Sequence, residues 1–268
     1  MKHIKQLRFI GFLIFLFLFN QVCSPVPASV EKRYYAKEYV DLQTSQKKVI
    51  DGIITLLKEN PENDLPDELI IKTHLPGDAL VRTLTALEYS YFPYTDYRNI
   101  SIVDGTRNWD YDKDILIYPK EMKIAYEKEK KYKKIAEKWV KECTSPNMSN
   151  LDKAQNITKL IAKKSSYTDK YLKPYSLLKE GKGVCNSYAI LLKEMMQIAG
   201  IKSARYCYGY YENSYHAWVT YSIDKKVYYI DPTHYDNTGN PKYINMKRLP
   251  DNYHLDYIQS NFCYDFYH

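Results

Sequence analysis

Three short motifs in the second half of the chain constrain it more than any other feature. A thiol stands in Gly-Val-Cys185, an imidazole follows in His216-Ala-Trp, and a carboxylate follows in Asp231-Pro-Thr. These are the parts of an activated nucleophile: the attacking group, a base for its proton, and a group that orients the base. The sequence therefore predicts that Cys185, His216 and Asp231 form a catalytic triad.

A helical pattern begins at Cys185 and runs to about Ala199, where Gly200 stops it. Its wide apolar surface predicts a helix buried by neighbours on more than one side. Unpaired amides and the positive dipole favour a thiolate at such a helix start and could hold an oxyanion during acyl transfer. Gly181-Lys182-Gly183 can form the preceding sharp turn. The alternative is an inert, buried structural cysteine.

His216 begins an alternating segment that predicts a β-strand ending at Ile223, and residues 227–231 form the returning strand of a hairpin. The turn between them is Asp224-Lys225. If the strands pair directly across this turn, Asp231 lies diagonal to His216, with roughly 7–8 Å between Cα atoms. A hydrogen bond between carboxylate and imidazole is within reach at that distance.

His234 follows Asp231-Pro-Thr where this strand should already be ending. We therefore expect it to lie outside the catalytic group, and its replacement by alanine to keep most activity. The spacing of cysteines and histidines lacks the close pairs typical of zinc sites. No metal and no other cofactor is expected.

These motifs and their flanks resemble the transglutaminase-like superfamily, a branch of the papain-like cysteine enzymes, over about residues 150–235. The resemblance implies an α+β core with the catalytic cysteine at a helix N-terminus, packed on an antiparallel sheet. It implies that Cys185 is the nucleophile, that His216 is the general base and then acid, and that Asp231 orients it. Many members carry Asn after His-Ala-Trp, whereas this chain has Val219. That departure leaves the triad intact.

Two aromatic residues are candidate cleft or oxyanion contributors. The resemblance places an aromatic residue upstream of the cysteine, where this chain has Tyr167. Trp218 is expected on the same strand face as His216 and could wall the cleft against water. The alternatives are a tyrosine packed among many others and a tryptophan of the core.

The N-terminus has the layout of a secretory signal peptide. A basic segment ends at Arg8, an apolar run covers residues 9–19, and Ala28 offers a cleavage site, so residues 1–28 are the predicted leader. The apolar run is shorter than the roughly 20 residues of a spanning helix. We expect a secreted or cell-surface protein without a stable membrane span once the leader is removed; an uncleaved anchor is the alternative.

Net charge and cysteine content bear on two questions: whether the protein binds nucleic acid and whether it forms a disulfide. Removal of Lys2, Lys5 and Arg8 takes three charges from the formal net charge of +7. The remainder is too small to indicate nucleic-acid binding. An exported location permits one disulfide among Cys143, Cys207 and Cys263, but their spacing does not select a pair.

Residues 29–145 are expected to form a separate, smaller α+β region that positions substrate or shields the cleft. It contains predicted helices near residues 49–57 and 78–91, strands near 69–71, 100–103 and 115–118, and a long charged helix from Pro119 to about Cys143. Ser149 is the expected cap of the next helix, within a core of residues 146–268. Residues 243–268 carry no recognised functional signal.

The leading functional hypothesis is secreted, thiol-dependent acyl transfer or hydrolysis at amide bonds through a thioester on Cys185. Glutamine carboxamides or peptides, some of them associated with the cell wall, are the expected substrates. One alternative is a cysteine peptidase acting on proteins or wall peptides. Another is a non-catalytic wall- or protein-binding module on the same fold. The oligomeric state does not follow from the sequence.

Overall fold

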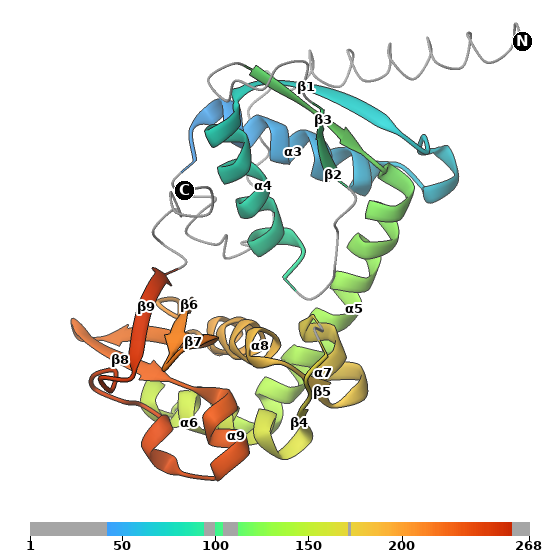
Figure 1. The fold of residues 1–268 in the computed structure, drawn as a ribbon. Helices are drawn as coiled ribbons and strands as arrows, with labels where there is room; N and C mark the ends of the chain where they lie inside the picture. The colour runs from blue at the N-terminus through green and yellow to red at the C-terminus, as the bar shows by residue number, and fades with distance from the viewer. Residues whose placement is uncertain (1–41, 94–99, 104–111, 171–172, 259–268) are drawn as a thin grey trace, which may run out of the picture. The chain divides into compact units, whose positions relative to one another are not determined.

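A computed structural model describes residues 42–93, 100–103, 112–170 and 173–258 (Figure 1). Within these ranges the chain forms two compact units, one of residues 42–87, 100–103 and 112–124, the other of residues 88–93, 125–170 and 173–258. The predicted leader lies outside the described residues. No helix in these ranges combines the length and apolar character needed to cross a membrane.

The boundary between the units falls inside α5 (Pro119–Cys143), whereas the sequence analysis placed it after residue 145. The helix has the predicted bounds, but its two ends belong to different cores. Ala136, Trp139 and Val140 are buried in the core of the second unit, which explains why most of the helix is counted with that unit.

The first unit has an antiparallel sheet with strand order β1-β3-β2. The predicted strand pair is present, with Ile102 opposite Ile115. Buried aliphatic residues on α3 and β1 form part of its core. The elements are α3 (Thr44–Glu59), η1 (Glu62–Asp64), β1 (Leu69–Pro76), α4 (Gly77–Tyr91), β2 (Ile100–Val103) and β3 (Asp112–Ile117).

The second unit is the α+β core (Figure 1). Its helices are α6 (Asn150–Lys164), α7 (Pro174–Glu180), α8 (Cys185–Ile198), α9 (Pro232–Thr238) and the short η2 (Pro241–Tyr243). Its strands are β4 (Ser166–Tyr167), β5 (Lys182–Gly183), β6 (Arg205–Tyr211), β7 (Ser214–Ile223), β8 (Lys226–Ile230) and β9 (Tyr253–Ile258). Ser149 caps α6 as predicted, accepting a hydrogen bond from the backbone N–H of Asp152.

The main sheet is antiparallel, with strand order β8-β7-β6-β9. The hairpin has the predicted register, with Ile223 opposite Lys226. Its turn residues Asp224 and Lys225 have φ values of 48° and 65°, the left-handed backbone that tight hairpins require. The predicted fold class is confirmed: the helix that begins at Cys185 packs against an antiparallel sheet.

The two faces of β7 have different neighbours. Ala217, Val219 and Tyr221 join the large core that contains α8. Trp218 joins a smaller cluster with Tyr253 of β9. The C-terminal segment therefore supplies an edge strand whose Tyr253 packs against Trp218 of the His216 motif. The sequence carried no signal of this role.

Candidate active site

Close packing at two glycines sets the start of α8. Gly181 ends α7 with a φ of 66°, and a Cβ at this position would lie 2.9 Å from the carbonyl oxygen of Lys164. A Cβ on Gly183 would lie 2.8 Å from the Leu177 side chain. Because both positions exclude larger side chains, the turn holds the backbone close to α7 and delivers Cys185 to the first position of α8.

The first turn of α8 offers hydrogen-bond donors at its open end. The first backbone bond of the helix runs from the N–H of Tyr188 to the carbonyl of Val184, at 3.1 Å. The amides of Cys185 and Asn186 precede that bond and have no acceptor within the helix. They are candidate donors to an oxyanion formed on a carbonyl that Cys185 attacks.

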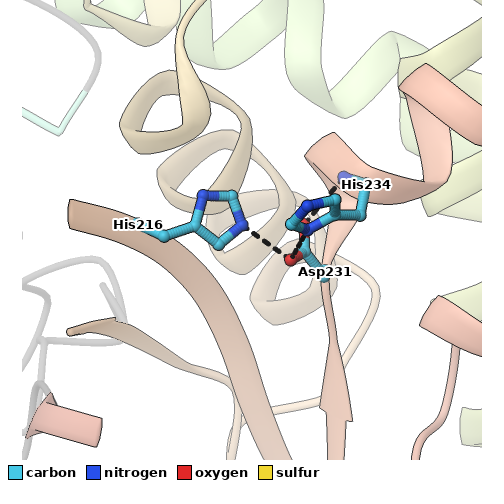
Figure 2. Close-up of side chains that lie close together, drawn as sticks. All are labelled: His216, Asp231 and His234. Carbon is cyan, nitrogen blue, oxygen red and sulfur yellow. Dashed lines mark hydrogen bonds and ion pairs between the residues drawn. The ribbon is translucent and has the colours of Figure 1, made fainter. Parts of the chain in front are cut away.

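His216 links Cys185 to Asp231. Its Nε2 lies 2.6 Å from Oδ2 of Asp231 (Figure 2), and the Cys185 side chain is close enough to influence its pKa. Burial alone lowers the pKa of His216, but the hydrogen bonds and charges of Asp231 and Cys185 outweigh that effect and raise the pKa to about 9. The imidazole is therefore held as a cation at neutral pH, between a thiol and a carboxylate.

Asp231 is a buried anion surrounded by donors. As N-cap of α9, its Oδ1 accepts the backbone N–H of His234 at 2.9 Å, while its Oδ2 accepts the hydroxyl of Tyr253 at 2.7 Å. Burial alone raises the pKa of this carboxyl, but hydrogen bonds from His216 and His234 hold it well below its usual range. The carboxylate can therefore remain ionised without contact with water.

His234 belongs to this cluster, so the expectation that it lies outside is wrong. Its Nδ1 is 2.6 Å from Oδ2 of Asp231 (Figure 2). Its ring stacks on Tyr243, with centroids 5.0 Å apart, and Tyr211 lies on it at 4.2 Å. The reason is local: after the strand ends, Pro232 begins a helix, and its third residue turns back towards the cap.

A hydrogen bond joins α8, which begins at Cys185, to α9, which Asp231 caps. Tyr188, on the first turn of α8, donates its hydroxyl to Asp236 of α9 at 2.8 Å. The same carboxylate accepts the backbone N–H of Tyr167. Because these contacts join α8, α9 and β4, they fix the position of Cys185 relative to Asp231.

The two candidate cleft residues have different environments. Tyr167 is 46% exposed, and burial of its hydroxyl, with a smaller effect of a charged Cys185, raises its pKa. Trp218 is fully buried and packs edge-on against Tyr253 at 5.4 Å. This packing favours the alternative of a core tryptophan, because the C-terminal segment covers the face of the sheet on which Trp218 lies.

The other cysteines differ from Cys185. Within the described ranges Cys143 and Cys207 are free thiols, and Cys263 lies outside those ranges. Burial is the main cause that raises the pKa of Cys143 to about 11, and Cys207 is fully buried. Of the disulfides that the sequence permits, the one between these two described thiols is absent.

One group of side chains could in principle hold a metal ion. His216, Asp231 and His234 each offer a ligand atom, and these atoms lie within 4.8 Å of one another. However, one ring nitrogen of each histidine lies at hydrogen-bond distance from the same oxygen, Oδ2 of Asp231. An ion would have to replace both hydrogen bonds, so the arrangement suits proton-bearing imidazoles better than ligands.

Comparison with known proteins agrees with the motifs. Residues 137–232 match the family described as the transglutaminase-like superfamily. Comparison with curated proteins finds no match.

Two solved structures are among those similar to the chain. A proposed cysteine protease from Cytophaga hutchinsonii is 25% identical over 39% of this chain and 37% of its own, with a TM-score of 0.33. A TGase is 13% identical over 79% of this chain and 59% of its own, with a TM-score of 0.32. The match spans less than two thirds of either protein. Residues 137–232, which include Cys185, His216 and Asp231, are therefore similar to the transglutaminase-like superfamily.

Proposed function

We propose that this protein is a thiol-dependent enzyme that transfers or hydrolyses acyl groups at amide bonds of proteins or peptides. Cys185 is the nucleophile, His216 carries the proton, and Asp231 orients the imidazole and stabilises its cation. The observation that carries the proposal is the position of His216, whose imidazole is hydrogen-bonded to the buried carboxylate of Asp231 and whose pKa is raised by both Asp231 and Cys185.

In the first half of the reaction, the Cys185 thiolate attacks the carbonyl carbon and the carbonyl electrons move to oxygen. The amides at the start of α8 are the candidate donors to this oxyanion. As the oxyanion collapses, the C–N bond breaks and the amine takes the proton of the His216 imidazolium. A thioester on Cys185 and a neutral His216 remain.

In the second half, neutral His216 removes a proton from water or from an acceptor amine, which attacks the thioester carbon. The C–S bond breaks and the thiolate reforms beside the imidazolium, so the site returns to its starting charges. Water gives a carboxylic acid and an amine gives a new amide. The proposed triad supports both outcomes, and access of the acceptor selects between them.

Iodoacetamide alkylation tests the nucleophile on the full chain. At pH 6–7 we expect peptide mapping to find Cys185 carboxamidomethylated first, because it lies at the open end of α8 and is not fully buried. Cys143 and Cys207 are internal controls, since burial raises the pKa of both thiols. Equal labelling of Cys185 and Cys143 in the folded chain, or labelling of Cys185 only after unfolding, would overturn the assignment.

Trapping the acyl-enzyme tests the reaction itself. Incubation with glutamine-containing peptides, with and without a tagged amine, should give a mass increase on Cys185 and then either tagged product or free acid. Cys185→Ala should give neither.

An export step is part of the proposal and is supported by the leader-like residues 1–28. Recovery of the protein only from the cytosol would contradict it.

A further inference from the structure

A pocket of about 380 Å³ lies beside the triad, on the side formed by the C-terminal segment. Three cationic side chains line it: Lys242, Lys247 and Arg248. Three tyrosine rings complete most of its wall: Tyr211, Tyr243 and Tyr253. All of these residues belong to the second unit.

The charge of the pocket is one-sided. Its lining contains three cations and no carboxylate; Asp251, close by in the chain, is not among the lining residues. Lys242, Lys247 and Arg248 are all exposed, and in the part of the chain that the structure describes no ion pair involves them. Lys242 instead lies over the Tyr243 ring, 4.8 Å from its centroid. The three cationic side chains are therefore available to bind an anion that is not part of this unit.

The same pocket borders the hydrogen-bond network of the triad. The hydroxyl of Tyr253 donates to Asp231 at 2.7 Å, and both Tyr211 and Tyr243 lie against His234. A ligand that contacts Tyr253 is separated by that one side chain from Asp231, the residue proposed to orient His216. The pocket therefore adjoins the residues that hold Asp231 and His234 in place.

We propose that this pocket binds a carboxylate of the peptide on which Cys185 acts, from an acidic side chain or a terminal carboxyl group. The inference rests on the proposed function, because it takes the substrate to be a peptide. Arg248 can hold a carboxylate by two parallel hydrogen bonds, and the lysines add charge. The tyrosine faces can cover the apolar stem of an Asp or Glu side chain while its charged end meets the cations.

Calorimetric titration of the Cys185→Ala full chain measures this preference without turnover. The probes are a blocked peptide with two adjacent Glu residues and the same peptide with two Gln residues. We expect the acidic peptide to bind about tenfold more tightly at low salt, because exposed ion pairs contribute modestly but add up over several cations. Raising the salt concentration should reduce the preference.

Matched variants locate the effect. Lys247→Gln with Arg248→Gln should remove the preference, whereas Lys225→Gln with Lys226→Gln removes the same charge at the exposed hairpin turn and should keep it. Charge reversal by Lys247→Glu with Arg248→Glu should turn the preference towards a Lys-containing peptide. Equal effects of the pocket and hairpin variants, or no preference in the starting protein, would overturn the proposal.

Inorganic phosphate separates two sources of the same chemistry. Competition by phosphate against the acidic peptide supports a shared anion site. Phosphate binding that depends on Lys247 and Arg248, with no preference for the acidic peptide, would overturn the peptide assignment in favour of a free anion. Alkylation of Cys185 in the native chain is a separate readout: its failure would overturn the proposed function and not the binding preference.

Discussion

Nδ1 of His234 lies 2.6 Å from Oδ2 of Asp231. This is the same distance that separates the carboxylate from the imidazole of His216. One carboxylate oxygen therefore serves two imidazoles and the hydroxyl of Tyr253 at once. The strength with which Asp231 stabilises the His216 cation therefore depends on the hydrogen bonds that His234 and Tyr253 make to the same oxygen.

His234→Ala should reduce activity, contrary to the expectation from the sequence. Loss of one donor leaves Asp231 less well fixed, so we expect a loss of about tenfold, smaller than that for His216→Ala. His234→Asn can return a donor near the Nδ1 position and should recover much of the loss. The check is kcat and its pH profile for both variants; unchanged kinetics in His234→Ala would make His234 a structural cap only.

The three proposed triad residues should differ in the size of their effects. Cys185→Ala should abolish acyl-enzyme formation, because no other group can replace the sulfur. His216→Ala should cost at least about 10²–10⁴-fold in kcat, since it removes both proton transfers. Asp231→Asn should cost less. A larger loss in Asp231→Asn than in His216→Ala, with both variants folded, would contradict the assigned roles.

Asp231→Asn should also move the alkaline limit of the reaction. The pKa of His216 is raised to about 9, and Asp231 is a main cause that raises it. Activity that needs the imidazolium should therefore decline as the pH passes about 9 in the native enzyme and at lower pH in the variant. The coupled thiol and imidazole titrate as a pair, so the measured limit is that of the pair. An alkaline limit that does not move would show that Asp231 does not control this proton.

The same shift predicts a pH dependence of stability. Because the pKa of His216 is raised from 6.5 to about 9 on folding, its contribution is fully present below pH 6.5 and is lost as the pH rises towards 9. The contribution is about 3 kcal/mol at most. Urea unfolding between pH 6 and 10 measures it, and His216→Gln should flatten the decline. An equally steep decline in that variant would assign the effect to another group.

The local elements of this chain could be predicted from the sequence because their signals lie within a few residues. The long helix starts at Pro119, Ser149 caps the next one, and the hairpin turns at Asp224-Lys225, all as expected. Each depends on a cap, a proline or a turn whose cause is local. The hairpin register in turn placed Asp231 within reach of His216.

Other parts of the site could not be predicted in this way. Tyr253 reaches Asp231 because β9 pairs with β6, and no local pattern in the chain encodes which strand becomes the neighbour of another. For His234 the sequence does carry a local signal. Asp231 followed by Pro is typical of a helix cap, and the third residue of a helix can bond back to its cap.

Tyr253→Phe removes one donor from a buried carboxylate and little else. We expect a destabilisation of about 1–3 kcal/mol, because Asp231 then lacks one of its hydrogen bonds in an interior site. Tyr215→Phe is the matched control: that residue is 71% exposed, so the same change should have almost no effect. Thermal unfolding of the two variants compares them. Equal melting temperatures would mean that the Tyr253 hydroxyl does not stabilise the carboxylate.

Trp218→Ala separates a core role from a cleft role. The indole is fully buried beside Tyr253 and lies 6.2 Å from the His216 ring. Its removal should leave a cavity and lower the free energy of unfolding by about 3–5 kcal/mol. Trp218→Phe fills part of the space and should lose less. Denaturant unfolding measures both variants, and the ratio of hydrolysed to amine-transferred product should stay unchanged wherever the protein remains folded. A stable Trp218→Ala protein with more hydrolysis would restore the cleft role, because only a residue in contact with the thioester's surroundings could admit water without loosening the core.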